Sequence, residues 1–519
     1  MMAMRRLVLP FCCLLATSRV DAQPAPESFH IEETSIADIH AAMRAGTLTC
    51  HDLVAQYLRR IEAYDKNGPA INALVVVNPD ALHVADSLDA RFRRGGLTGP
   101  LHCIPMIVKD NFETTDLPTT AGSLSMKGFV SNKDAFMVRR IREAGAIVLA
   151  KSNMAEFAFS PYETVNSILP GYTKNPYELD RVTAGSSGGT AAAVAANLGE
   201  VGLGTDTGNS IRGPSSHQAL VGIRSTMGLT SRAGVVPLNL SADIAGPMAR
   251  SVADAVAVFQ VVAGYDAADS ITAAVRERPM PNYAASLVRD GLRGARIGIL
   301  RQAYERPSLD PEVRDVFARA VAELRLGGAI VVDSVPMPQL DSLFAAHRGQ
   351  CNPFKFDLER WIASTGNRTP VKSLAEIIRS GRYHPSIQKR LELAEAVDLP
   401  PEQNPGCRDR DEFRQGLRAL VLHAMDAQHL DALIYPTWSN PPRLIGDLNT
   451  PAGDNSQLFS PSTGWPAITV PMGYTRGSLP AGMPFFGRAW SEPVLIRLAY
   501  SYEQTTHHRR PPATTPPLR

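Results

Sequence analysis

The sequence has no marked excess of charge of either sign. Lysines and arginines number 53 and aspartates and glutamates 51, so the formal net charge is only +2. Proteins whose main partner is a nucleic acid carry a basic patch or stripe, and no block of like charges occurs in this chain. We therefore expect no nucleic-acid partner. With 44% hydrophobic residues over 519 positions, the composition is that of a globular protein with a large core.

The motifs of common metal and phosphate sites are also missing. The sequence contains neither C-x-x-C nor H-E-x-x-H, which are frequent arrangements of zinc ligands. A glycine-rich stretch at 183–193, TAGSSGGTAAA, lacks the lysine that a phosphate-binding loop requires. The sequence thus predicts a protein with no metal ion and no other cofactor.

Long apolar runs are absent beyond the N-terminus. No segment there reaches the roughly 18 uninterrupted apolar residues that indicate a membrane-spanning helix. We therefore expect the mature protein to be soluble and to have no membrane partner.

The first 22 residues form a pattern of their own. Arg5 and Arg6 precede an apolar run at 7–16, and the small residue Ala22 precedes Gln23. This order is typical of a secretory signal peptide, and a run of about ten residues is too short to span a bilayer. We predict cleavage near Ala22 and a periplasmic or extracellular protein. An uncleaved anchor or a disordered tail is the alternative interpretation.

Few cysteines remain after the predicted cleavage. Two of the six lie within the signal, and the other four permit three disulfide pairings in an oxidising compartment. Free buried thiols are the alternative, and the spacing does not distinguish between the two. The four positions are Cys50, Cys103, Cys351 and Cys407.

Apolar periodicity alternates between strand and helix along most of the chain, which predicts an α/β fold. We expect a linker at 23–34 and one large domain over 35–510. Within that domain, 338–428 is richer in charge and should consist mostly of helical insertions. The Pro-rich end at 511–519 is expected to be frayed. The expected strands lie at 71–77, 104–109, 146–151, 200–205, 296–301, 329–335, 430–437 and 466–474, and the expected helices within 35–64, where Thr49 can cap the second of two, and at 134–144, 190–198 and 311–326.

The glycine-rich stretch carries two adjacent serines, Ser186 and Ser187. Residues 185–189 match G-x-S-x-G with Ser187 in the centre, the pattern of the nucleophile elbow in α/β-hydrolases. Such an elbow follows a buried strand, whereas the preceding segment NPYELDRVT is polar and turn-like. An esterase that uses Ser187 is therefore a remote alternative.

A third serine lies in a better place for nucleophilic attack. In GLGTDTGNSIRGPSS, at 202–216, Ser210 follows a short strand and a tight turn and precedes the next helix. Backbone N–H groups at such a turn are unpaired and can stabilise an oxyanion. A serine hydroxyl also needs a base, and Lys109 ends the apolar run IPMIV. Burial there would lower its pKa, although pairing with Asp110 at a sheet edge is the alternative.

Histidines offer no better base, because none of the candidates lies in a diagnostic context. These candidates are His102, His217, His423 and His429.

Three segments in this order resemble the amidase signature family, which hydrolyses amide bonds with a Ser–cis-Ser–Lys triad. The resemblance covers about 35–510 and is weak only in 338–428. It implies an α/β/α sandwich around a central mixed sheet. The three segments are GPLHCIPMIVKDN at 99–111, TAGSSGGTAAAVAANLG at 183–199 and GTDTGNSIRGPSS at 204–216.

By this resemblance, Lys109 is the base, Ser210 the nucleophile and Ser186 the serine that relays the proton between them. The Gly185–Ser186 peptide bond is then expected to be cis. Ser187 is expected to support the relay by hydrogen bonds rather than to attack the substrate.

The oxyanion is expected to be held by the backbone N–H groups of Thr207, Gly208, Asn209 and Ser210. Asn209 departs from the family, which usually has glycine before the nucleophile; asparagine tolerates a positive φ, so the turn can survive. Its side chain would narrow the oxyanion site or add a polar contact to the substrate. Cys103 is a second departure, at a position where glycine is common.

The resemblance implies an enzyme that cleaves C–N bonds of small-molecule amides, or of carbamates or esters, through an acyl-enzyme. The alternatives are the glutaminase subunit of a tRNA-dependent amidotransferase and a non-catalytic amidase-like binding protein. The expected export argues against the first, and the presence of both Lys109 and Ser210 argues against the second. The substrate is left open, and so is the choice between monomer and homodimer.

Overall fold

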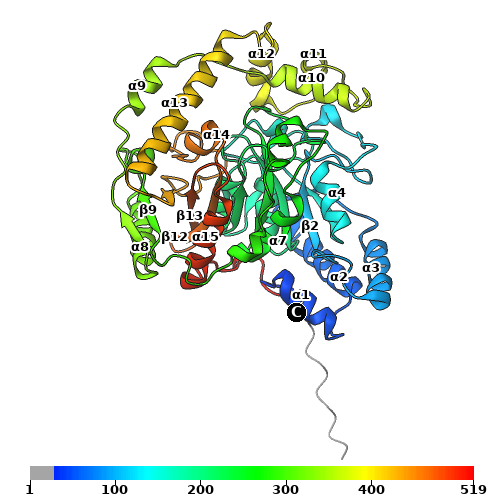
Figure 1. The fold of residues 1–519 in the computed structure, drawn as a ribbon. Coiled ribbons are helices and arrows are strands. Elements are labelled where there is room, and N and C mark those ends of the chain that lie inside the picture. The colour runs from blue at the N-terminus through cyan, green and yellow to red at the C-terminus, as the bar shows by residue number, and fades with distance from the viewer. Residues whose placement is uncertain (1–28, 519) are drawn as a thin grey trace, which may run out of the picture.

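A computed structural model describes residues 29–518 of the chain, so the predicted signal peptide at 1–22 lies outside the described residues. A mixed eleven-stranded sheet crosses the middle of the molecule between helices (Figure 1), and the predicted α/β/α sandwich is confirmed. The strand order is β1-β3-β2-β6-β8-β7-β12-β13-β11-β9-β10. The strands span β1 Leu74–Val77, β2 Pro105–Lys109, β3 Ile147–Ser152, β6 Val201–Asp206, β7 Val221–Arg224, β8 Ile244–Ala249, β9 Arg296–Ile299, β10 Ile330–Val332, β11 Ala432–Ile434, β12 Ala467–Thr475 and β13 Leu479–Phe486.

Three neighbouring strands in one half of the sheet are parallel. β2 lies between β3 and β6, and Met106 of β2 pairs with Val148 on one side and Val201 on the other. Every residue of these three strands is buried, as expected for parallel strands covered on both faces. Their carboxyl ends meet at one edge, which is where ligand sites of α/β sheets usually lie.

Two groups of helices pack on the sheet. In one group α4 packs against α7, α7 against α15, and α15 against α8. In the other, α5 packs on β2 and β6 while α6 packs on β12 and β13. The N-terminal helices α2 and α3 pack together, and Thr49 caps α2 as predicted. The helices span α1 Ile36–Arg44, α2 Cys50–Ile61, α3 Ala81–Gly95, α4 Phe136–Glu143, α5 Gly188–Ala195, α6 Arg212–His217, α7 Val252–Val262, α8 Pro311–Leu326 and α15 Glu492–Thr506.

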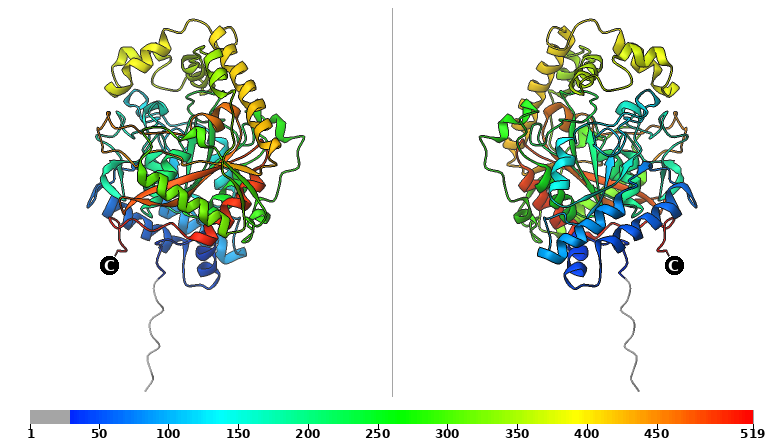
Figure 2. Two further views of the ribbon diagram at one scale, coloured as in Figure 1. Left: turned by 90° about the vertical axis from the view of Figure 1, so that its left-hand side faces the viewer. Right: turned by 90° about the vertical axis from the view of Figure 1, so that its right-hand side faces the viewer.

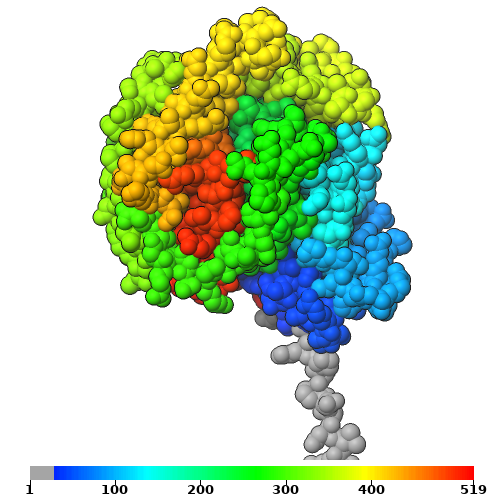
Figure 3. Space-filling model, in the orientation of Figure 1, coloured from blue at the N-terminus to red at the C-terminus, as the bar shows by residue number. Residues whose placement is uncertain are grey.

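The segment 338–428 forms an arch of helices at one end of the molecule (Figures 1 and 2). In the space-filling view its atoms make up the upper rim of the visible face (Figure 3). The arch contains α9 Leu340–Ala346, α10 Phe354–Ser364, α11 Leu374–Ser380, α12 Gln388–Glu395 and α13 Pro405–Ala427, and α13 also packs on α14, Phe459–Thr463.

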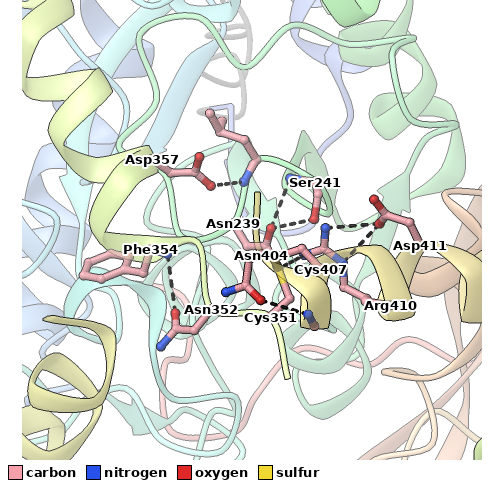
Figure 4. Close-up of a disulfide and its surroundings, with 12 residues drawn as sticks. Asn239, Ser241, Cys351, Asn352, Phe354, Asp357, Asn404, Cys407, Arg410 and Asp411 are labelled. Carbon is pink, nitrogen blue, oxygen red and sulfur yellow. Dashed lines mark hydrogen bonds and ion pairs between the residues drawn. A yellow bond between two sulfur atoms is a disulfide. The ribbon is translucent and has the colours of Figure 1, made fainter. Parts of the chain in front are cut away.

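A disulfide joins the beginnings of the two longest helices in this arch. Cys351 precedes α10, and Cys407 lies in the first turn of α13. Figure 4 shows the bond near Asp357 of α10, whose carboxylate accepts a hydrogen bond from the backbone N–H of Leu240 (2.9 Å). The arch is therefore anchored on the loop at 238–243, which also contacts the candidate site described below.

The second disulfide joins Cys50, at the start of α2, to Cys103, with 5.5 Å between the Cα atoms. The structure thus contains one of the three pairings that the sequence left open. Cys103 has a φ of 64°, a conformation that glycine adopts without cost. This conformation explains why glycine suits the position. In this chain the side chain of Cys103 forms the disulfide.

Two predictions about the chain are wrong. The segment NPYELDRVT is more than a turn: its turn at 176–177 joins β4 (Lys174–Asn175) and β5 (Glu178–Val182), which form a two-stranded antiparallel sheet. β5 is largely exposed, so it is still not the buried strand of a nucleophile elbow. The Pro-rich end is not frayed, because Arg60 donates hydrogen bonds to the carbonyls of Thr515 (2.9 Å) and Pro516 (3.0 Å).

Within residues 29–518, none of the helices combines the length and the apolar character that crossing a bilayer requires.

Candidate active site

The candidate site lies at the carboxyl ends of the parallel strands β2 and β6. Lys109 is the last residue of β2, and Asp206 is the last residue of β6. The turn at 207–211 follows Asp206 and leads into α6. The glycine-rich stretch at 183–189 leads into α5, which packs on the same two strands. The fold thus brings the three motifs of the sequence to one edge of the sheet.

Lys109 is fully buried and faces hydroxyl groups rather than a carboxylate. Its Nζ donates hydrogen bonds to Ser186 Oγ (2.7 Å) and to Thr205 Oγ1 (2.7 Å). The alternative of an edge lysine paired with Asp110 is wrong, because β2 is an interior strand. Asp110 instead accepts hydrogen bonds from the backbone N–H groups of Thr120 (3.2 Å) and Gly122 (3.1 Å).

The charge state of Lys109 follows from this environment. Burial disfavours the ammonium form and is the largest influence, while the carboxylates of Asp206 and Asp243 favour it. The net result is a pKa of about 7 for Lys109. Near neutral pH a substantial fraction of this lysine is therefore neutral and able to accept a proton.

The glycines allow the backbone around the two serines to pack closely. A Cβ on Gly185 would lie 2.4 Å from the carbonyl oxygen of Ser160, and one on Gly188 would lie 2.0 Å from Thr164 Oγ1. Neither neighbour leaves room for a side chain. The Gly185–Ser186 peptide bond is cis, as the family resemblance implied.

Ser187 uses its hydroxyl to hold the neighbouring strand. Its Oγ donates to the carbonyl of Thr205 (3.1 Å) and accepts from the N–H of the same residue (3.3 Å). The side chain is fully buried. These contacts leave the hydroxyl poorly placed for attack on a substrate.

Asp206 organises the turn that carries Ser210. Its carboxylate accepts hydrogen bonds from the N–H groups of Ile211 (3.1 Å) and Arg212 (3.3 Å). It also forms buried ion pairs with Arg212 and Arg224, each at 3.0 Å. Burial alone would raise the pKa of Asp206, but the two arginines outweigh it and lower the pKa to about 2. Asp206 is therefore ionised throughout the ordinary pH range.

The turn presents backbone donors that have no partner. Within residues 29–518, none of the N–H groups of residues 207–210 donates a hydrogen bond. Ser210 is 5% exposed, and its hydroxyl has no hydrogen-bond partner in the same part of the chain, Ser186 included. The structure therefore brings Lys109 and Ser186 into direct contact, whereas Ser210 lies at the turn without a hydrogen bond to either.

Asn209 differs from the expectation in its backbone. It is not among the residues with positive φ, so tolerance of that conformation does not explain its presence. Its side chain is fully buried, and Nδ2 donates to Asp454 Oδ2 (2.6 Å).

Sequence reasoning missed four polar residues around the site. Asp206 could have been found, because a charged residue directly after a buried strand needs partners. Thr205, Asp243 and Asp454 had no such signal, since their contacts form between segments far apart in the chain. Thr205 binds Lys109, Asp243 accepts from the Thr207 hydroxyl, and Asp454 accepts from Asn209.

A cavity of about 600 Å³ lies between the arch and the loop at 239–241. Both positively and negatively charged side chains line this cavity, which suits a polar ligand. The charged lining residues are Arg232, Asp269, Asp357, Arg360, Glu402 and Arg410.

The chain belongs to the amidase family, whose model matches residues 52–496. It is 39% identical to the peptide amidase of Stenotrophomonas maltophilia, with a TM-score of 0.82 over 93% of this chain and 99% of that one. It is 34% identical to an Arabidopsis thaliana protein named "probable amidase", over 98% of this chain and 96% of the other. It is 32% identical to a component of the glutamyl-tRNA(Gln) amidotransferase of Acinetobacter baumannii, over 92% and 96%. These similarities indicate a hydrolase of C–N bonds.

Proposed function

We propose that the protein is an exported amide hydrolase that works through Ser210, Ser186 and Lys109. Neutral Lys109 takes the proton of Ser186 while Ser186 takes that of Ser210, and Ser210 attacks the amide carbonyl. The N–H groups of residues 207–210 hold the oxyanion. The relay then protonates the leaving nitrogen, and water releases the acyl group from Ser210.

One observation carries this proposal: a buried lysine donates to Ser186 and is within ion-pair distance of no carboxylate among residues 29–518. A buried lysine that is partly neutral and bound to a hydroxyl is suited to be a general base. The unpaired donors at 207–210 support the assignment of the oxyanion site.

The substrate class is best tested with a panel of amides, carbamates and esters. Peptide amides come first, because the similar Stenotrophomonas enzyme is a peptide amidase. Hydrolysis of a peptide amide or another amide above the rate of the Ser210→Ala variant supports the proposal. No hydrolysis of any member would favour a binding protein.

Similarity to an amidotransferase component makes a glutaminase the second candidate. Such a protein would release ammonia from glutamine and act with partner chains. Glutamine is therefore included in the panel, and we expect it to be a poor substrate compared with the best amide. Efficient glutamine hydrolysis would favour the second candidate.

The proposed chemistry uses only side chains and backbone N–H groups, so we expect it to be independent of metal. Dialysis against a strong chelator should leave kcat/KM unchanged. The test is informative because His347, Asp409 and Glu412 bring possible ligand atoms within 4.8 Å of one another. A loss of activity that Zn²⁺ restores would contradict the proposed mechanism.

Export is supported by the N-terminal sequence and by the two disulfides, which are typical of oxidising compartments. We expect the protein made by a bacterial host to be secreted with residues up to about Ala22 removed. Intact mass of the secreted protein measures this. Full-length protein recovered from the cytosol would speak against export.

A further inference from the structure

The loop at 454–457 packs directly on the turn that contains Ser210. Asn209 Nδ2 donates to Asp454 Oδ2 at 2.6 Å. Arg212 donates both to the carbonyl of Ser456 (2.8 Å) and to that of Gly208 (2.6 Å), so it links the loop to the turn a second time. The two segments are more than 240 residues apart in the chain.

Asp454 is the only hydrogen-bond partner of the Asn209 side chain among residues 29–518. Asn209 is fully buried, and its Oδ1 has no partner in that part of the chain. A buried amide held at one end by a carboxylate is strongly restrained, since charge-assisted hydrogen bonds are stronger than neutral ones. Losing Asp454 would leave both ends of the amide unpaired, which favours a rearrangement of the turn.

We propose that Asp454 is a positioning residue: by holding Asn209, it keeps the backbone N–H groups of the turn at 207–210 aimed at the oxyanion. This inference rests on the proposed function. Asp454 does not touch the substrate in this account. It acts through Asn209, which takes the position where the family usually has glycine and gives the turn a side chain by which it can be held.

The hydrogen bonds of Asp454 make its effect dependent on protonation. Oδ2 accepts from Asn209 and from Gln457 Nε2 (2.7 Å), and Oδ1 accepts from the N–H (3.0 Å) and the hydroxyl (2.8 Å) of Ser456. Both oxygens are thus fully used, so adding a proton displaces one of the four donors.

The charged and titratable groups that act on Asp454 come from three elements. Burial raises the pKa of Asp454 to about 6 as the largest influence, while Gln457, Ser456 and Arg212 of α6 oppose it. Asp206 at the end of β6 and Tyr435 after β11 belong to the same buried group, since the charges of Arg212, Asp454 and Asp206 all act on the Tyr435 hydroxyl. Because the ionised form accepts all four donors, the restraint on Asn209 is complete above about pH 6 and weakens as the pH falls below it, when the added proton displaces a donor.

The first test is a double-mutant cycle on the best amide substrate. Complete removal of one oxyanion donor lowers kcat about 10²–10³-fold. A turn whose donors are present but wrongly aimed should lower kcat by less. We therefore expect Asp454→Ala and Asp454→Asn to lower kcat by about tenfold or more with KM little changed. In an Asn209→Gly background, whatever its own rate, adding either change should lower kcat no further.

Asp447→Ala is the matched control, because Asp447 lies shortly before the loop at 454–457 and, among residues 29–518, its carboxylate accepts hydrogen bonds only from Asn449 (2.9 Å) and Thr450 (3.0 Å). It should keep wild-type kcat. Wild-type kcat in Asp454→Ala, or an equal loss in the Asn209→Gly background, would overturn the inference. If Ser210→Ala is inactive in the same assay, a failure of the Asp454 prediction leaves the proposed function unaffected. A fully active Ser210→Ala variant would instead contradict the proposed function itself.

A pH measurement decides the matter even if the Asp454 variants fail to fold. Loss of neutral Lys109 already lowers kcat/KM as the pH falls from 7 to 5. The wild type should lose about a further fivefold over this interval through protonation of Asp454, and Asn209→Gly should not. Parallel profiles for the two proteins would contradict the inference.

Discussion

Ser210→Ala should lower kcat for an amide by about 10⁴-fold or more, because it removes the proposed nucleophile. The same change should barely alter stability, since the hydroxyl has no hydrogen-bond partner within residues 29–518. Steady-state kinetics measure the first effect, and thermal unfolding measures the second. An inactive protein with a wild-type Tm would show that the loss is chemical.

Ser187→Ala is the matched control for this prediction. It removes a neighbouring buried hydroxyl that is bonded to both backbone groups of Thr205. We expect a lower Tm, since leaving buried partners unpaired costs about 1–3 kcal/mol, together with a much smaller loss of turnover. Survival of activity in Ser210→Ala, with loss in Ser187→Ala, would move the nucleophile to the glycine-rich stretch.

Lys109→Ala should abolish most of the activity and also change its pH dependence. Lys109 acts as a base in its neutral form, and burial lowers its pKa to about 7. In the wild type, kcat/KM should therefore rise with pH through a midpoint near 7 and level off above it. The midpoint belongs to the hydroxyl–lysine relay as a unit, because its groups titrate together. The variant should lose this rise.

The same variant should discriminate between amides and esters. An ester has a better leaving group than an amide, so its departure needs less help from a proton. Lys109→Ala should therefore lose more amide than ester hydrolysis on a matched pair of substrates. An unchanged pH profile in the variant would remove lysine from the mechanism and return attention to the histidines.

The parts of the site that could be predicted are those that depend only on the pattern of residues within a short segment. The run IPMIVK places a lysine directly after five apolar residues, and the structure buries that lysine at the end of an interior strand. Ser210 follows a strand and precedes a helix, as predicted. Local patterns of this kind report which backbone groups are buried and which are left unpaired.

The remaining parts depend on contacts between distant segments. Asp454 reaches Asn209 across 245 positions of the chain, and nothing in its own neighbourhood indicates this. Strands β8 and β13 were missed because their sequences, IAGPMA and LPAGMPFF, contain glycine and proline, which are usually depleted in strands. Their neighbours in the sheet override this local preference.

The most direct test of the mechanism is to find the acyl group. An activated ester that reacts with the protein at low pH, where release is slow, should be quenched, digested and examined by peptide mass spectrometry. We predict that the added mass lies on Ser210 in the wild type and is absent from Ser210→Ala. An adduct on Ser187, or turnover without any adduct in the presence of a saturating ester, would contradict it.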